Sequence, residues 1–233
     1  MVERYGIDVS RWQGVIDWDK LAENADLSFV ILRAASGTAY DSKFKEYIKE
    51  VKRVNIPFGL YFASTALSVE DAEKEADFAI GVLREHSAEY PAFYDVELNA
   101  QKSLGSAKVT NILKTWLDRV SAAGYKAGYY TNKAWLDSVI DEKQLSGYPL
   151  WYAAYPSVAE KTLTDAPKDN RSKLSYPQAA IWQWSSCGKV DGINTKVDLN
   201  VCYETYPLPV VSEKKYLTLA DVKAMGYAGF IIE

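Results

Sequence analysis

Eight short apolar segments recur along this 233-residue chain, and they constrain its fold more than any other feature. Most are continuous apolar runs rather than alternating ones, which is typical of strands buried on both faces of a parallel sheet. We therefore expect strands at residues 4–9, 28–35, 57–63, 91–97, 125–131, 149–154, 179–184 and 195–200.

Helical patterns separate the first of these segments but not the last. Apolar residues at helical spacing predict helices at residues 17–25, 42–54, 68–86, 106–123 and 132–143. After about residue 150 the helical pattern fades. The order is therefore five βα units followed by three strands, which predicts an α/β fold, an irregular TIM-like barrel without its last helices.

Composition argues against several classes of function. The net charge of −4 gives no basic field for nucleic acid, and no segment approaches the ~20 apolar residues of a membrane-inserted helix. With one His and two Cys there is no cluster for a transition metal, and we predict neither a metal nor a cofactor. We expect Cys187 and Cys202 to be free thiols. By contrast, 17 Tyr and 7 Trp suit a carbohydrate ligand, because sugar C–H faces pack on flat rings.

Three of the expected strands end in acidic residues. Asp8 ends the first, and Asp198 lies near the end of the last. Asp95 and Glu97 end the fourth, and residues i and i+2 of a strand point the same way. In a parallel barrel such strand ends line one face, and the first and last strands are neighbours. We therefore expect four carboxyl groups in one mouth, where like charge and burial raise at least one pKa, as glycoside hydrolysis requires.

A structural role for each acid by itself is the alternative. A single Asp-x-Glu at a strand end is commonly a solvated tip, and Asp8 could cap the segment that follows it. Asp198 could form a local turn bond with Asn200. The convergence of three strand ends favours a catalytic site over these separate roles.

The order of the motifs resembles one known family. Between residues 4 and 206 the chain carries in turn "GIDVSRWQG", "FVILRAASG", "FGLYF", "YDVE", "GYYTN", "LWYAAY", "IWQWSS" and "VDLN". In this order they resemble glycoside hydrolase family 25, the Chalaropsis-type lysozymes found in phage endolysins and bacteria. The family fold is an irregular barrel of five βα units followed by three strands, in agreement with the order of elements above.

The resemblance implies N-acetylmuramidase activity on peptidoglycan, the bacterial cell wall glycan, at the β-1,4 bond between N-acetylmuramic acid and N-acetylglucosamine. It makes Glu97 the proton donor and Asp95 the partner that orients or polarises the 2-acetamido group of the substrate. Asp8 and Asp198 align with the remaining acids, and Arg33 with an arginine that steadies a carboxylate. Rings at or near the groove align with Tyr61, Tyr130, Trp151 and Trp184.

These roles lead to an expected mechanism with two open routes. We expect Asp95 to stay ionised and to raise the pKa of Glu97 by charge repulsion. Either the acetamido carbonyl then attacks the anomeric carbon with retention, or a carboxylate-activated water attacks with inversion. The sequence does not separate the two.

The resemblance makes residues 1–206 one catalytic barrel. Residues 207–233 lie outside it: "PLPVV" predicts a linker, and the rest is expected to be a helix docked on the barrel or the start of a cell-wall-binding module. The N-terminal "MVERYGIDVS" has no apolar h-region. We therefore expect no signal peptide, synthesis in a host cytoplasm, and release to the cell wall as for a phage endolysin.

Two other interpretations stay open. One is a chitinase-like hydrolase of another family, which normally has a longer acidic run before the Asp-x-Glu, where this chain has Phe93 and Tyr94. The other is a non-catalytic cell-wall-binding barrel, which the presence of all four acids disfavours.

Overall fold

The computed structural model describes residues 3–168 and 170–206. Its strands are β1 (Arg4–Val9), β2 (Phe29–Ser36), β3 (Ala39–Tyr40), β4 (Phe58–Ala63), β5 (Ala92–Asp95), β6 (Ala127–Asn132), β7 (Leu150–Ala153), β8 (Ile181–Gly188) and β9 (Val197–Cys202). Its α-helices are α1 (Trp18–Ala22), α2 (Phe44–Arg53), α3 (Val69–Glu85), α4 (Asn99–Lys102), α5 (Ser106–Ala122) and α6 (Lys133–Ser138). Its 3-10 helices are η1 (Arg11–Gln13), η2 (Glu142–Leu145), η3 (Leu163–Asp165) and η4 (Arg171–Lys173).

All strands except β3 close into a barrel. Neighbouring strands follow the order β1-β9-β8-β7-β6-β5-β4-β2, and β1 pairs with β2 to complete the ring. The pairs from β1–β2 round to β7–β8 are parallel. Only β9 is reversed, because it is antiparallel to both β8 and β1. The expected irregular barrel is confirmed, with its last strand running against the others.

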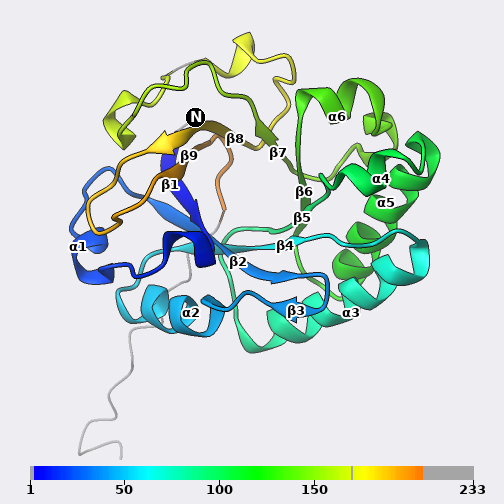
Figure 1. Cartoon of the computed structure of the whole chain (residues 1–233), viewed down its shortest axis with the longest axis horizontal. Coiled ribbons are helices and arrows are strands. Elements are labelled where there is room, and N and C mark those ends of the chain that lie inside the picture. Colours follow the sequence, from blue (N-terminus) through cyan, green and yellow to red (C-terminus); the bar gives the residue numbers. More distant parts are fainter. Residues whose placement is uncertain (1–2, 169, 207–233) are drawn as a thin grey trace, which may run out of the picture.

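The helices lie outside this ring and leave one side without them. Helices α1, α2, α3, α5 and α6 follow strands in chain order and give five βα units, whereas within the described residues no α-helix follows β7. Figure 1 shows α2 to α6 around β2 to β6 and α1 apart from them at the left, with coil and short turns next to β7, β8 and β9. The short elements β3 and α4 were not predicted, because two and four residues show no periodicity.

The barrel wall separates two apolar clusters. The inner cluster contains large rings such as Phe29, Phe93 and Trp151, whereas the larger cluster lies between the strands and the helices. Glycines make room for the inner rings. A Cβ on Gly6 would lie 2.6 Å from the Phe29 ring, and one on Gly128 would lie 2.7 Å from the Phe93 ring. These two positions therefore exclude any side chain, and the inner rings fill the barrel below the rim.

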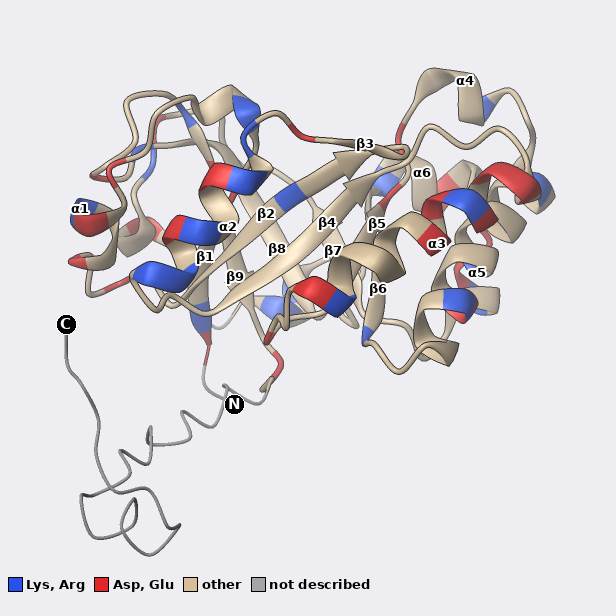
Figure 2. Cartoon of the chain, turned by 90° about the horizontal axis from the view of Figure 1, so that it is seen from below, with Lys and Arg blue, Asp and Glu red and all other residues tan. Residues whose placement is uncertain are grey.

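Charged residues gather on the helices and loops, and the strands in Figure 2 are almost free of them. Within residues 3–168 and 170–206, no helix has both the length and the apolar character needed to cross a membrane. Cys187 and Cys202 are free thiols, as expected. The expected linker and C-terminal segment at 207–233 lie outside the described residues.

Candidate active site

The four acids meet at one rim of the barrel. Asp8 near the end of β1 pairs directly with Asp198 of β9, so their side chains share a face. Because β9 is antiparallel, Asp198 stands near its start and still reaches the rim formed by the C-terminal ends of the parallel strands. Asp95 is the last residue of β5, and Glu97 follows two residues later.

A pocket of about 100 Å³ opens at this rim. Its walls hold all four acids together with three of the four rings expected at the groove, and one amide that was not expected there. The lining residues are Asp8, Tyr61, Asp95, Glu97, Tyr130, Trp151, Gln183 and Asp198.

Trp151 is the centre of the ring cluster under the acids. Its ring meets those of Tyr61, Phe93 and Tyr130 edge-on, with centroids 5.7, 5.3 and 4.7 Å away. Its Nε1 donates to Asn200 Oδ1 at 2.8 Å, and the side chain is buried. Tyr61 and Tyr130 are partly exposed. A ligand in the pocket would therefore meet these two tyrosines, with Trp151 supporting them.

Two amide side chains fix Asp8. Gln183 Nε2 and Asn200 Nδ2 each donate to Asp8 Oδ2 at 2.8 Å, and the Tyr130 hydroxyl donates to Gln183 Oε1 at 2.8 Å. Burial raises the pKa of Asp8 to about 6, although both hydrogen bonds lower it. Of the four acids, Asp8 is the one whose ionised form has amide donors.

Asp95 is buried and has an oxygen without a partner. Only 9% of the residue is exposed, and Oδ1 has no hydrogen-bond partner among the described residues. Burial first, and then the charges of Glu97 and Asp8, hold the pKa of Asp95 well above its usual value, while Arg33 opposes them. A buried acceptor without a donor costs free energy. An N–H or O–H group of a ligand in the pocket would remove that cost.

Glu97 is the exposed member of the set, at the mouth of the pocket. Burial of the part that lines the wall raises its pKa. Burial and the charges of Asp8 and Glu97 raise the pKa of Asp198 to about 8. The two acids repel each other, and burial comes first among the causes for both. The expectation of an Asp95 that stays readily ionised beside Glu97 is therefore corrected, because the pKa of both acids is raised.

Arg33 lies close to the acids but holds a different carboxylate. Its Nε donates to Asp41 Oδ2 at 2.7 Å, and its Nη2 lies 2.6 Å from the same oxygen. Asp41 follows β3 and also accepts a hydrogen bond from the backbone N–H of Lys43 at 2.9 Å. The arginine does steady a carboxylate, but one outside the pocket. It acts on Asp95 through its charge, which lowers the pKa of Asp95.

The sequence that forms this barrel and its four rim acids matches a known protein family. The model for "Glycosyl hydrolases family 25" matches residues 7–193, well over half of the chain. The chain belongs to this family. The family resemblance noted in the sequence is thereby confirmed.

Characterised and solved proteins support the same family 25 assignment. Lysozyme M1 of Streptomyces globisporus is 28% identical over 207 residues, which cover 84% of this chain and 66% of that protein. The autolysin LytC of Streptococcus pneumoniae, solved with a synthetic peptidoglycan ligand, has a TM-score of 0.72 and 26% identity over 86% of this chain and 47% of that one. The catalytic domain of endolysin ply40, from bacteriophage P40 of Listeria monocytogenes, has a TM-score of 0.62 and 26% identity, covering 86% of this chain and 93% of that domain. The family 25 chain thus spans about two thirds of the first protein and under half of the second.

One ring expected at the groove of this family 25 chain lies elsewhere. Side chains alternate along β8, so that Ile181 belongs to the inner cluster and Gln183 lines the pocket. Trp182 and Trp184 point the other way, into the cluster between the strands and the helices. The expectation of Trp184 in the groove is therefore replaced by Gln183, its neighbour on the opposite face.

Two site residues, Gln183 and Asn200, were not identified as such from the sequence. The signal was a polar amide inside an otherwise apolar strand, in "IWQW" and in "VDLN". Asn200 makes no local turn bond with Asp198 among the described residues. Instead, its side chain joins Asp8 on one side to Trp151 on the other.

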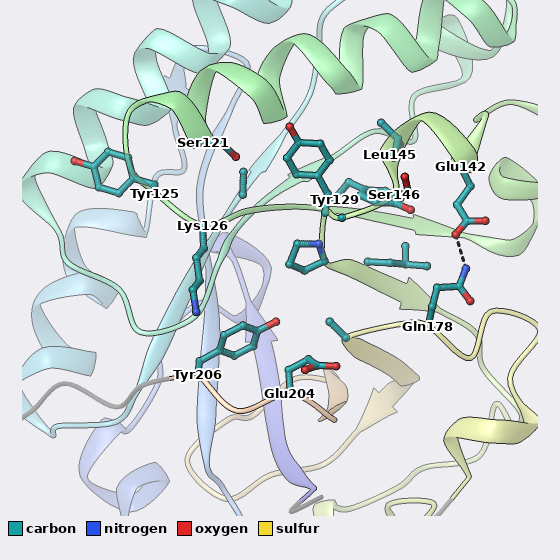
Figure 3. Close-up of a pocket in the computed structure, with 16 residues that line it drawn as sticks. Ser121, Tyr125, Lys126, Tyr129, Glu142, Leu145, Ser146, Gln178, Glu204 and Tyr206 are labelled. Carbon is teal, nitrogen blue, oxygen red and sulfur yellow. Dashed lines mark hydrogen bonds between the residues drawn. The ribbon is translucent and has the colours of Figure 1, made fainter.

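A larger pocket, of about 710 Å³, lies at the other end of the family 25 barrel, where β6 and β7 begin. Figure 3 shows Tyr129 and Tyr206 among the side chains that line it. Its two acids, Glu142 and Glu204, each have a hydrogen-bond donor as partner. The smaller pocket is therefore the candidate active site, because it gathers four carboxyl groups and the unpartnered oxygen belongs to one of them, Asp95.

The raised pKa values predict that the domain is more stable in acid. When an acid has a higher pKa folded than unfolded, the stability that it contributes is complete below the unfolded pKa and is lost as the pH rises through the folded pKa. For Asp198 this range runs from 3.8 to about 8. We expect Asp198→Asn to raise Tm at pH 8 and to change it little at pH 4, because the amide carries no charge to bury.

The size of this effect follows from the linkage between protonation and folding. A tenfold change in an ionisation constant corresponds to ~1.4 kcal/mol, or roughly 3–6 °C in Tm for a domain of this size. Scanning calorimetry at both pH values measures it, with the exposed Asp191→Asn as the matched control. An equal change in Tm at pH 4 and pH 8 would show that Asp198 does not resist ionisation in the folded domain.

Proposed function

We propose that this domain is an N-acetylmuramidase, a lysozyme that hydrolyses the β-1,4 bond between N-acetylmuramic acid and N-acetylglucosamine in peptidoglycan. The observation that carries the proposal is the buried, unpartnered Oδ1 of Asp95 in the same pocket as the exposed Glu97. Glycoside hydrolysis needs a carboxyl group that gives a proton and a second group that supports charge at the anomeric carbon. The pocket supplies both.

In this proposal Glu97 is the general acid. It lies at the mouth, where a glycosidic oxygen can reach it, and burial of its inner part raises its pKa so that it keeps its proton to higher pH. As the bond from the anomeric carbon to the leaving oxygen breaks, the Glu97 proton moves to that oxygen and Glu97 becomes a carboxylate. Help of this kind contributes roughly 10²–10⁴-fold to a rate.

Asp95 supports the developing charge through the substrate. Its unpartnered oxygen accepts the N–H of the 2-acetamido group, which holds the acetamido carbonyl oxygen against the anomeric carbon. Attack by that oxygen forms a cyclic intermediate, and water activated by the Glu97 carboxylate then opens it with overall retention. This is the substrate-assisted exception to the two-carboxylate rule. NMR of the first product separates the routes: a β-anomer fits this one, and an α-anomer would require inversion.

Peptidoglycan as substrate has two lines of support. Lysozyme M1 is similar over 84% of this chain, and LytC, similar over 86% of it, was solved with a synthetic peptidoglycan ligand. In the pocket itself, Tyr61 and Tyr130 present partly exposed rings beside the acids. Rings of this kind pack against sugar faces.

A turbidity assay on purified cell walls tests the proposal. We expect the suspension to clear, with new reducing ends appearing in proportion. A chitinase-like enzyme would release sugar from chitin and leave the walls intact. A wall-binding barrel without activity would sediment with the walls and release nothing. Either of these two results would overturn the proposal.

We further propose that the domain reaches the wall after release from the cell that makes it, as a phage endolysin does. The ply40 endolysin domain supports this, because this chain covers 93% of it. So does the lysozyme of Lactococcus phage mv1, which is 25% identical over 175 residues. Expression in a bacterium with a sensitive wall tests the route. We expect lysis only when a membrane pore is opened, and lysis without a pore would contradict the proposal.

A further inference from the structure

Gln101 on α4 lies outside the pocket but is fully buried and uses both ends of its amide. Its Oε1 accepts a hydrogen bond from the backbone N–H of Leu98 at 3.0 Å. Its Nε2 donates to Ser64 Oγ at 2.9 Å and to the backbone oxygen of Ala66 at 3.1 Å. One side chain thus joins the segment after β5 to the segment after β4.

A buried polar chain continues from Gln101 to helix α3. Ser64 Oγ donates to the Tyr94 hydroxyl at 2.8 Å, and that hydroxyl donates to Glu75 Oε2 at 2.7 Å. Glu75 Oε1 in turn accepts hydrogen bonds from the backbone N–H and the hydroxyl of Thr65 at 3.0 and 2.7 Å. Gln101 is therefore anchored to a satisfied network in the core.

Glu97 stands between two fixed points of this framework. On one side, the backbone oxygen of Asp95 accepts a hydrogen bond from Ser64 N–H at 2.8 Å. On the other side, Gln101 holds the N–H of Leu98. Burial raises the pKa of the Glu97 carboxyl, and among the described residues no hydrogen bond to this carboxyl contributes. The direction of this side chain therefore depends on the backbone on either side of it.

We propose that Gln101 is a positioning residue for Glu97. By fixing the peptide that follows Glu97, Gln101 holds the general acid against the pocket wall. The proposal rests on the proposed function for the role of Glu97 as the acid. A shift of about 1 Å in a catalytic group costs on the order of 10²-fold in rate. Loss of the Gln101 bonds lets the segment after β5 move away from the wall and carries Glu97 toward solvent.

Several groups face Glu97 from other strands and belong to its electrostatic surroundings. They are Asp8 on β1, Asp95 on β5, Tyr130 on β6, Tyr155 after β7, and Asp198 on β9. A Glu97 side chain that moves toward solvent leaves both this acidic set and the wall. Its carboxyl group then titrates at lower pH.

The test is Gln101→Leu, which keeps most of the volume and removes all three hydrogen bonds. We expect kcat on solubilised glycan to fall roughly 10–100-fold, with KM within about threefold. The basic limb of the pH profile should move to lower pH, because an acid that loses its proton earlier stops working earlier. Carboxyl ¹³C NMR, assigned with Glu97→Gln, should show the same shift of the Glu97 titration without any need for turnover.

Two companion variants keep the test decisive. Ser64→Ala removes one hydrogen-bond partner of Gln101. It should change kcat, the pH profile and the Glu97 titration in the same directions but by smaller amounts, so it replaces Gln101→Leu if that variant does not fold. Gln144→Leu removes an exposed glutamine in the 3-10 helix η2, which donates to Asp141 Oδ2 at 2.7 Å, and should leave every readout unchanged.

The outcomes separate this proposal from the proposed function. A normal kcat, pH profile and Glu97 titration in Gln101→Leu would overturn the positioning role, even if Tm fell. A wild-type domain without turnover at any pH would overturn the proposed function instead. The NMR titration would then still decide whether Gln101 holds Glu97.

Discussion

Glu97→Gln is expected to lower the rate of wall hydrolysis by roughly 10²–10⁴-fold. The amide keeps the shape of the side chain but has no acidic proton to give to the leaving oxygen. Because Glu97 is exposed and no hydrogen bond contributes to its pKa, we expect the free energy of unfolding to change by no more than about 0.5 kcal/mol. Release of reducing ends from purified walls measures the rate, and thermal melts measure the stability.

The matched control is Glu73→Gln on α3, an exposed glutamate away from the pocket. It should retain full activity. The Glu97→Gln variant should also still sediment with cell walls, because its rings and its other acids are unchanged. Activity of Glu97→Gln within a few-fold of the wild type would mean that another group donates the proton.

Asp95→Asn is expected to be nearly as severe, with a loss on the order of 10²–10³-fold in kcat, comparable to the removal of one preorganised electrostatic partner. The amide presents N–H groups to a position where the substrate N–H needs an acceptor. At the same time, we expect Tm at pH 7 to rise. The pKa of Asp95 in the folded domain lies well above its usual value, so the folded domain is less stable at pH 7 than at low pH. Asparagine does not ionise and therefore avoids that loss.

Opposite changes in activity and stability are what distinguish a catalytic Asp95 from a structural one. Calorimetry at pH 4 and pH 7, with kinetics on the same preparations, measures both. If Asp95→Asn lost activity and also melted at a lower temperature at pH 7, the acid would be holding the fold together, and its assigned role toward the substrate would be wrong.

The sequence predicted most of the barrel because each of its signals is local. Continuous apolar runs mark strands buried on both faces, and helical spacing marks the helices that cover them. The same logic brought Asp8, Asp95 and Glu97 to one rim. Asp198 was expected at that rim as the end of a parallel strand. Asp198 lies there because β9 is antiparallel to its neighbours, so that the first residues of β9 reach this rim. The direction of β9 depends on long-range strand pairing, which no local sequence pattern contains.

The hydrogen bonds that hold Asp8 could not be predicted in the same way. Gln183 and Asn200 reach Asp8 from strands about 175 and 192 residues further along the chain. Their bonds follow from barrel closure rather than from spacing. Trp184 was expected in the groove as an aromatic residue on the right strand, but alternation along β8 gives that place to Gln183. The pKa of Glu97 likewise depends on how much of its side chain the wall covers, which the sequence does not contain.

The most direct test of the account is mass spectrometry of the fragments that the domain releases from purified cell walls, after borohydride reduction of their new ends. Cleavage by the acids at this rim predicts disaccharide peptides whose reduced end is N-acetylmuramic acid, absent when Glu97→Gln replaces the wild type. Fragments that end in reduced N-acetylglucosamine, or the same fragments released by Glu97→Gln, would contradict it.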